Sequence, residues 1–436
     1  MDTSLFDTVI LPDPTARSHT EHDGWTPAIP SCRLCGMKLT RTLIDLGAMP
    51  LANTYVTRDE AGSGVDRPHP LHVRVCDSCL LAQVDTTIPP DAIFSDYAYF
   101  SSYSTSWVEH AARYATAMID RFGLGPASRV MEVASNDGYL LRHFHAAGIQ
   151  VLGIEPAINV AASARRIGIP TETVFFGADT AMEIAAQHGR ADLIAANNVL
   201  AHVPDIFGFV AGFAAVLRPN GVVTFEFPHL LNLLEEVQFD TIYHEHYSYL
   251  SLLVVERVLR STGLRAFDVE RLPTHGGSLR VYACHAGGPH STRPGLRNVR
   301  AAEKRAMLND PDTYDRFAPK VAAVRAGFQI FLSAQRASGR RVAAYGAAAK
   351  GNTFLNFCGA SARDIACIAD RNPAKQGRLT PGSHIPIVAP EVLFDSPPDD
   401  VIILPWNLTA EVTAQLAPLR QAGTQFWIAS PTMRRV

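Results

Sequence analysis

Strand-like and helix-like runs alternate along the middle of this 436-residue chain, and this alternation restricts the fold more than any other feature. Between about Asp91 and Arg297, apolar runs of strand length are followed by runs with helical periodicity. Such an order is typical of a parallel sheet covered by helices. We expect strands at 128–133, 151–154, 192–196 and 221–227, and helices at 139–147, 158–167 and 206–217. The sequence therefore predicts a doubly wound α/β domain over 91–297.

Two further segments flank this domain. Residues 30–90 are turn-rich and hold four of the seven cysteines. A mixed-charge helical stretch from about Arg300 to Ser338 leads into a second βα series, which predicts a Rossmann-like α/β domain over 298–436. Its expected strands are 341–345, 365–370, 401–404 and 424–429, and its expected helices are 349–357 and 409–422. Residues 1–29 are predicted to be a disordered leader.

Composition limits the functional classes. A hydrophobic fraction of 47% with 19% charged residues is ordinary for a soluble enzyme. The net charge of −3 gives no basic field for nucleic acid or an anionic membrane. No apolar run approaches the roughly 20 residues that span a bilayer, and the start of the chain lacks a signal-peptide pattern. The odd number of cysteines, seven, fits a reducing compartment, so we expect a cytoplasmic protein.

Four cysteines in two Cys-x-x-Cys pairs indicate a metal site in the first segment. The pairs are Cys32 with Cys35 and Cys76 with Cys79. Two such pairs supply the four thiolates of a tetrahedral zinc site, and the 40-residue gap requires an inserted loop or hairpin. The alternatives are four unligated thiols or a redox dithiol, and a dithiol needs only one pair at a helix start. Because protein fills all four positions, we expect a structural Zn²⁺ that stabilises a segment too small to fold alone.

The turn after the first central strand indicates an S-adenosylmethionine (SAM) site. Glu132-x-Ala134-x-Asn136-x-Gly138 is an eroded form of the acid-x-Gly-x-Gly-x-Gly turn of class I methyltransferases. The Gly-x-Gly-x-x-Gly of a dinucleotide site is missing. The next strand ends in an acid, Glu155, which can accept hydrogen bonds from both ribose hydroxyls. The alternative is an ordinary α/β turn without a donor. The predicted SAM-binding residues are Glu132, Ser135, Asn136, Asp137, Gly138, Glu155, Pro156, Asn197, Asn198 and His202.

Residues 241–249 combine two imidazoles, one carboxylate and three phenols. A dry core could not satisfy so many polar groups, and the set suits removal of a proton from carbon. His244 and His246 would share a face if the segment were extended, and one base is enough, so we expect His244 in a supporting role. Metal binding by the two histidines is the alternative, and a pair without a third ligand is weak support for it.

Six motifs in order carry a resemblance to a known family. They are the paired cysteines, Tyr97–Ser104, Glu132–Leu140, Tyr243–His246, His275–Arg280 and Tyr345–Asn352. The set resembles the zinc-containing nucleotide-sugar C-methyltransferases, which place a branching methyl on C-3 of dTDP-4-keto-deoxysugars. The resemblance covers nearly the whole chain after the leader, and the Tyr-His-Glu-His run is its most diagnostic part. It implies SAM and structural Zn²⁺ as cofactors, a sugar nucleotide as substrate, and a monomer.

The resemblance also implies roles for single residues. His246 would be the base for the C-3 proton, and Glu245 and Tyr243 would orient it or stabilise charge. Tyr97 and Tyr99 of the early tyrosine motif would close over the sugar, with Tyr97 counted among the catalytic residues. Whether Tyr97 or Tyr99 contacts the sugar is open. Glu226 could line the pocket or merely cap its strand, and His275–Arg280 could contact a ligand or form a tight turn. Lys350 could bind the diphosphate or be a solvated charge. The implied substrate-binding residues are Tyr99, Tyr103, Glu226, His275, Ser278, Arg280, Tyr345, Lys350, Asn352 and Asp370.

The sequence thus predicts a C-methyltransferase of branched deoxysugar biosynthesis, the kind used in antibiotics. Its steps would be removal of the C-3 proton, formation of an enolate and in-line attack on the sulfonium methyl. One alternative is a methyltransferase for an amine or hydroxyl, which needs weaker proton handling. The other is a zinc-ribbon nucleic-acid-binding protein, against which the acidic balance weighs.

Overall fold

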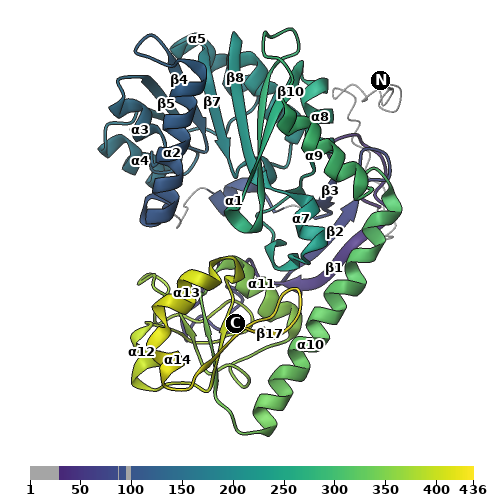
Figure 1. The fold of residues 1–436 in the computed structure, drawn as a ribbon, viewed down its shortest axis with the longest axis vertical. Helices are drawn as coiled ribbons and strands as arrows, with labels where there is room; N and C mark the ends of the chain where they lie inside the picture. Colours follow the sequence, from purple (N-terminus) through teal and green to yellow (C-terminus); the bar gives the residue numbers. More distant parts are fainter. Residues whose placement is uncertain (1–28, 87, 95–99) are drawn as a thin grey trace.

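Three β-sheets organise the computed structural model, which describes residues 29–86, 88–94 and 100–436. The central sheet and its helices form one part, a small sheet packs beside it, and a second α/β unit lies at the other end of the molecule (Figure 1). The predicted leader, apart from its last residue, lies outside the described residues. So do Tyr97 and Tyr99 of the early tyrosine motif.

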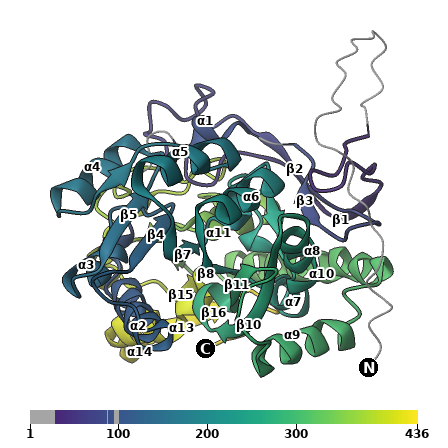
Figure 2. The same cartoon turned by 90° about the horizontal axis from the view of Figure 1, so that it is seen from above.

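The central sheet has seven strands in the order β10-β11-β8-β7-β4-β5-β6. Figure 2 shows this order from β10 to β5. Its core strands are parallel, and β10 and β11 add an antiparallel edge. The strands are β4 (Arg129–Val133), β5 (Gln150–Ile154), β6 (Thr171–Glu172), β7 (Ala191–Asn197), β8 (Leu217–Pro228), β10 (Leu264–Leu272) and β11 (Ser278–His285). The predicted doubly wound domain is confirmed.

Helices cover both faces of the central sheet because neighbouring strand residues point to opposite sides. Leu193 packs in one core with residues of α2 (Thr105–Phe122), α3 (Leu141–Ala146) and α4 (Ile158–Arg166). Ile194 packs in another with residues of α5 (Ala178–His188), α6 (Ile206–Val216), α7 (Leu230–Glu235) and α8 (Leu252–Ser261). Both side chains are fully buried. The near-continuous apolar run of β7 is therefore explained by burial on two faces.

The small N-terminal sheet takes its last strand from the central segment. Its order is β1 (Arg41–Met49), β2 (His69–Val75), β3 (Ala82–Val84) and β9 (Ser248–Tyr249), with antiparallel pairing throughout. The β1–β2 pair lies in the 40-residue gap between the cysteine pairs, so the expected hairpin is present. The short helix α1 (Pro90–Phe94) follows. The contribution of β9 was not predicted.

The helical stretch predicted between about Arg300 and Ser338 is interrupted, which corrects that expectation. Helix α9 (Pro294–Arg305) ends before a 3-10 turn at Pro311–Arg316, and α10 (Phe317–Ala337) follows. Pro311 lacks the amide hydrogen that an uninterrupted helix needs, and Asp310 instead accepts a hydrogen bond from the amide of Asp312. Helix α10 then runs along one side of the molecule toward the C-terminal unit (Figure 1).

The C-terminal unit contains a six-stranded sheet in the order β14-β13-β12-β15-β16-β17. All its pairs are parallel except β16 with β17. The predicted helix at 409–422 is wrong in one respect, because Pro418 follows a break that divides it into α13 and α14. The elements are β12 (Val342–Tyr345), α11 (Ala349–Cys358), β13 (Ile368–Ala369), β14 (Ile387–Val388), α12 (Glu391–Asp395), β15 (Asp400–Ile403), α13 (Thr409–Gln415), α14 (Ala417–Gln421), β16 (Gln425–Ile428) and β17 (Arg434–Arg435).

Across the described part of the chain, no helix combines the length and apolar character that crossing a bilayer requires.

Candidate active site

The turn after β4 lies where the chain changes direction across the central sheet. Strand β5 pairs on one side of β4, whereas β7 pairs on the other. Ligands of doubly wound sheets bind outside the carboxyl ends of the strands at such a point. Ala134, Asn136 and Gly138 have φ angles of 58°, 50° and 80°, so the turn coils tightly after the strand. A Cβ on Gly153 of β5 would lie 2.5 Å from Ser135 Oγ, so glycine permits this close approach.

Buried oxygens without protein partners gather at this point. Ser135 Oγ and Asp137 Oδ1 follow β4, and Oδ1 of both Asn197 and Asn198 belongs to the end of β7. Among the described residues, none of these four atoms has a hydrogen-bond partner. An unmade hydrogen bond of this kind costs about 1–3 kcal/mol, so a bound group should supply the missing partners. The amino and ribose hydroxyl groups of SAM are donors of the required kind, and the site fits that molecule.

The two predicted acids of the SAM site have different environments. Glu155 is buried, and its two oxygens accept hydrogen bonds of 2.9 Å from the amides of Asn136 and Ala157. Burial raises the pKa of Glu155, and these amides lower it. Each oxygen retains a second lone pair, so ribose binding stays a prediction. Glu132 is fully buried within β4; burial raises its pKa well above the usual value, and the Tyr139 hydroxyl lowers it.

The described end of the tyrosine motif is attached to the SAM turn. The amide of Ser101 donates to Asn136 Oδ1 at 2.8 Å, and the amide of Ser102 donates to Asp137 Oδ2 at 3.2 Å. Trp107, at the start of α2, stacks against Tyr139 with ring centroids 6.2 Å apart. Tyr103 is 80% exposed. Ser101 and Ser102 therefore border the predicted donor site, and contact of Tyr103 with a sugar stays a prediction.

His246 is buried with its ring held in one orientation. Its Nδ1 lies 2.9 Å from the carbonyl oxygen of Thr241, which can only accept, so Nδ1 carries the hydrogen and Nε2 the lone pair. Burial lowers the pKa of His246 well below its usual value, and the His202 imidazole adds to this effect. The centroids of the two rings are 4.6 Å apart. The ring is therefore neutral at neutral pH, and Nε2 can accept a proton. Burial also lowers the pKa of His202, to about 4.

Tyr243 and Glu245 flank this imidazole, because residues 243–246 form a turn closed by a 2.9 Å hydrogen bond from the His246 amide to the Tyr243 carbonyl. The Tyr243 ring lies 4.1 Å from the His246 ring, centroid to centroid. Glu245 is buried, and its Oε1 accepts a 2.6 Å hydrogen bond from Asn53 Nδ2. An imidazole, a phenol and a carboxyl group thus gather in one turn, and the predicted removal of a proton from carbon needs groups of these kinds.

His244 does not share the direction of His246. Its Nε2 lies 3.2 Å from the carbonyl oxygens of His69 and Pro70, at the start of β2. The turn removes the extended conformation that would have placed both rings on one face. In the described part of the chain, one group of side chains could hold a metal, and it comprises the four cysteines. The structure therefore does not support a His244–His246 metal site.

Glu226 and Arg280 form a buried ion pair at the end of β8. Arg280 Nη2 lies 2.7 Å from Glu226 Oε2, and Nη1 lies 3.2 Å from Glu270 Oε2. His110 and Thr274 complete the contacts of Glu226, at 3.2 Å and 3.1 Å. These bonds commit the guanidinium to carboxylates and favour a role in shaping the wall of the site. Direct contact of Glu226 or Arg280 with a substrate stays a prediction.

The His275–Ser278 turn joins β10 to β11 and contacts the C-terminal unit. His275 has a positive φ of 54°, and its Nε2 lies 3.4 Å from Asn198 Nδ2. Ser278 is buried and donates to the carbonyl of Thr274 at 3.0 Å. A Cβ on Gly276 would lie 2.3 Å from the Trp406 ring of the C-terminal unit. The turn is tight and also borders the predicted donor site through Asn198.

Lys350 lies at the direction change of the C-terminal sheet, between β12 and β15. Its ammonium donates to Asn407 Oδ1 at 2.7 Å and lies 4.6 Å from the centroid of the Trp406 ring. Trp406 Nε1 in turn donates to Asp240 Oδ2 at 2.7 Å. Burial raises the pKa of Asp240 to about 6. Asp240 lies five residues before Glu245, so this contact joins the carboxyl end of the C-terminal sheet to the turn of residues 243–246, the acid–base turn.

The other predicted residues of the C-terminal unit mainly make internal contacts. Tyr345 donates to Gln415 Oε1 at 2.8 Å, and buried Asn352 donates to the carbonyl of Ala52 at 2.7 Å. Asp370 Oδ2 accepts from the amide of Ala347, also at 2.7 Å. All three side chains are therefore used in contacts within the protein. Their contact with a substrate stays a prediction.

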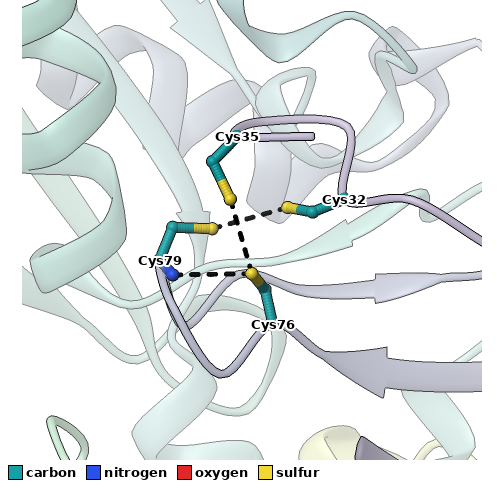
Figure 3. Close-up of side chains that lie close together, drawn as sticks. All are labelled: Cys32, Cys35, Cys76 and Cys79. Atoms are coloured by element: carbon teal, nitrogen blue, oxygen red, sulfur yellow. Dashed lines mark hydrogen bonds between the residues drawn. The ribbon is translucent and has the colours of Figure 1, made fainter. Parts of the chain in front are cut away.

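The four predicted zinc ligands converge at one point (Figure 3). The thiol sulfurs of Cys32, Cys35, Cys76 and Cys79 all lie within 4.8 Å of one another, and all four residues are buried. Each pair is closed alike: the amide of Gly36 donates to the Cys32 carbonyl, and that of Leu80 to the Cys76 carbonyl. Four converging thiolates are the donor set of a structural Zn²⁺ site, so the residues fit this ion.

Sequence reasoning missed several residues of the site. Asn53 and Tyr55 reach it from the loop after β1; the Tyr55 hydroxyl donates to the Ala347 carbonyl at 2.6 Å. Asp240 and Trp406, which join the two α/β units, were missed as well. A signal existed for Trp406, which follows β15 as ligand-contacting residues of such sheets do. No local pattern distinguishes Asn53.

Three protein-family profiles match the chain. "Putative zinc binding domain" matches residues 32–94, "Methyltransferase domain" matches 107–269, and "C-methyltransferase C-terminal domain" matches 273–431. The three lie in the order of the three sheets. They match the fold class and the methyltransferase activity expected from the sequence.

One relative covers nearly the whole chain. C-methyltransferase NovU from Streptomyces niveus is 36% identical over 406 residues, which are 93% of this chain and 96% of that protein. The ubiquinone biosynthesis O-methyltransferase of Rhodopseudomonas palustris (strain HaA2) is 31% identical over 96 residues, 22% of this chain and 38% of that protein. The crystal structure of magnesium protoporphyrin IX methyltransferase from Synechocystis PCC 6803 with bound SAM matches with a TM-score of 0.31 and 14% identity, covering 42% of this chain and 79% of that chain.

Proposed function

Because this chain belongs to the SAM-dependent C-methyltransferases, we propose that its acceptor is C-3 of a nucleotide-linked 4-keto-deoxysugar, with dTDP as the nucleotide. The observation that carries the proposal is the orientation of His246. Its hydrogen-bonded Nδ1 leaves Nε2 as a neutral, buried proton acceptor. Methyl transfer to an amine or hydroxyl does not require a proton to be removed from carbon, so it makes less demand on a base. The sequence resemblance supplies the choice of sugar.

In the proposed reaction, Nε2 of His246 removes the C-3 proton next to the 4-keto group. The resulting negative charge spreads onto the keto oxygen, where a phenol such as that of Tyr243 can donate a hydrogen bond. Glu245 lies in the same turn and can stabilise the protonated imidazole. SAM, which the turn after β4 and the end of β7 would hold, would supply an electrophilic methyl group. A bond from C-3 to this methyl would form as the sulfur–methyl bond breaks, with S-adenosylhomocysteine as the leaving group. The turn of residues 243–246 fixes the base and its neighbours in one arrangement.

The carboxyl end of the C-terminal sheet, around Lys350, is proposed to hold the diphosphate. Lys350 places a cation at the direction change of the sheet, next to Trp406. An ammonium group has three donors, and Asn407 uses one of them. The hydrogen bond from Trp406 to Asp240 connects the surroundings of Lys350 to the acid–base turn. A sugar nucleotide bound here would therefore place its sugar toward His246.

Loss of deuterium from C-3 tests the proposed chemistry directly. The substrate is the dTDP-4-keto-deoxysugar labelled with deuterium at C-3, incubated in ordinary water with S-adenosylhomocysteine in place of SAM. We expect washout faster than the enzyme-free background, measured by mass spectrometry, because the base acts on C–H. His246→Ala is the matched control and should show background exchange only. Methyl transfer from SAM to this sugar without any washout of the label would contradict carbon-acid chemistry by this base.

Replacing Lys350 by alanine is expected to raise the KM for the sugar nucleotide more than it lowers kcat. A charge-assisted hydrogen bond to a phosphate contributes about 1.5–3 kcal/mol, so the expected rise in KM is about tenfold or more. Steady-state kinetics at saturating SAM measures both constants. Lys304→Ala, an exposed lysine of α9, is the control. An unchanged KM would place the diphosphate elsewhere.

A further inference from the structure

Arg33 connects the turn of residues 32–35, the zinc knuckle, to residues 241–249, the acid–base segment. The residue lies between Cys32 and Cys35, and its side chain reaches a segment 214 residues away in sequence. Its Nη1 donates to the carbonyl of Val84 at 2.6 Å, and its Nη2 donates to the carbonyl of Tyr247. Ser248 Oγ lies 3.4 Å from the same Nη2. A zinc-ligand loop thus holds the backbone of the residue that follows His246.

Gln83 fixes the main chain from which Arg33 projects. The amide of Arg33 donates to Gln83 Oε1 at 2.9 Å, and Gln83 Nε2 donates to Cys32 Sγ at 3.1 Å. The Gln83 side chain is fully buried, and the residue pairs with Ser248 in the β3–β9 ladder. The position of Arg33 is therefore tied to a zinc ligand on one side and to β9 on the other.

Other contacts also hold residues 241–249 to the N-terminal part, at Glu245, at His244 and at the Tyr247 hydroxyl, which donates to the Ile88 carbonyl. The backbone after His246 is held by fewer contacts. Strand β9 contains two residues, so its ladder alone gives little stability. The Tyr247 carbonyl accepts from the Val84 amide at 3.1 Å, and the Tyr247 amide donates to the Ala201 carbonyl at 2.8 Å. The Arg33 guanidinium adds a charged, two-pronged donor that binds β3 and the Tyr247 carbonyl together. A planar guanidinium suits such bridging, whereas an ammonium acts from one point.

We propose that Arg33 is a positioning residue through which the zinc knuckle fixes the main chain after His246 and, with it, the direction of the His246 ring. The zinc site then has a task in the active site in addition to stabilising a small segment. The proposal rests on the proposed function in one respect, that His246 is the base. The contacts of Arg33 with Val84 and Tyr247 are independent of that assignment.

The test compares three variants of the full-length, zinc-loaded protein. Arg33→Met removes the donors at similar length, and Arg33→Lys keeps the charge with a single-point donor. Arg41→Met is the matched control, because Arg41 lies in β1 of the N-terminal sheet and pairs with Asp77, Asp312 and Asp315 at the surface. The measurements are zinc content, SAM affinity, kcat and KM, and amide hydrogen exchange of the peptide that covers 241–249.

For Arg33→Met we expect unchanged zinc content and SAM affinity, faster hydrogen exchange across 241–249, and a fall in kcat of about 10–100-fold with little change in KM, because small misplacement of a catalytic group is that costly. Arg33→Lys should lie between Arg33→Met and the wild type, which serves if Arg33→Met does not fold. Exchange across 241–249 equal to that of Arg41→Met in both variants would overturn the proposal. Faster exchange together with normal turnover of His246→Ala would instead leave Arg33 in place and remove His246 as the base.

Discussion

Replacing His246 by alanine is expected to lower kcat by about 10²–10⁴-fold, the range that a positioned general base contributes. The affinity for SAM should fall much less than kcat, because the buried oxygens expected to bind SAM lie at the ends of β4 and β7, and it is His202 of the predicted donor site that packs against the His246 ring. The physical reason is the orientation of the imidazole, with Nδ1 bound to the Thr241 carbonyl and Nε2 left to accept. Single-turnover methyl transfer and calorimetric titration with SAM or S-adenosylhomocysteine measure the two effects.

His244 supplies the matched comparison, since it lies in the same turn but directs Nε2 to the start of β2. We expect His244→Asn to lose far less activity than His246→Ala. The two substitutions together distinguish a chemical role from a general disturbance of the turn. A near-normal rate for His246→Ala would assign proton removal to another group, and Tyr243 and His202 are then the nearest candidates by ring distance.

The central sheet could be predicted because its signal is local. Buried parallel strands such as β7 are continuous apolar runs, and the helices between them bury one face, so strand and helix alternate visibly in the sequence. The breaks at Pro311 and Pro418 were missed although proline is a local signal, because the flanking residues kept a helical composition. The family, the fold class, SAM and the cysteine cluster follow from motifs, and the comparisons confirm them.

The relation between the three parts could not be predicted, because it depends on contacts between distant residues. Strand β9 has two residues, too few for a period, yet it completes the N-terminal sheet. Asn53 reaches Glu245 across 192 positions, and Trp406 reaches Asp240 across 166. For Arg280, the basic residue type suggested contact with an anion, but the sequence did not show that the anions are the carboxylates of Glu226 and Glu270. The domain bounds and the roles of the individual site residues stay predictions.

Removing one zinc ligand is the change expected to affect stability most. Cys76 is fully buried, and its sulfur belongs to the four-sulfur cluster that fits Zn²⁺. A structural zinc site contributes folding free energy on the order of 10 kcal/mol. That is comparable with the whole free energy of unfolding of a domain, about 5–15 kcal/mol. For Cys76→Ser we therefore expect loss of bound zinc, a lower melting temperature and loss of methyl transfer.

The reach of this effect separates two views of the zinc site. Since β9 and Arg33 join the cysteine cluster to the turn that holds His246, loss of zinc should disorder residues 241–249 while the central sheet still binds SAM. Metal analysis, thermal unfolding, SAM titration and hydrogen exchange of 241–249 measure the four quantities. Cys367→Ser, at a half-buried thiol next to β13, is the control and should retain zinc and activity. If Cys76→Ser loses zinc but keeps its melting temperature and its protection at 241–249, the site stabilises neither the N-terminal sheet nor the acid–base turn.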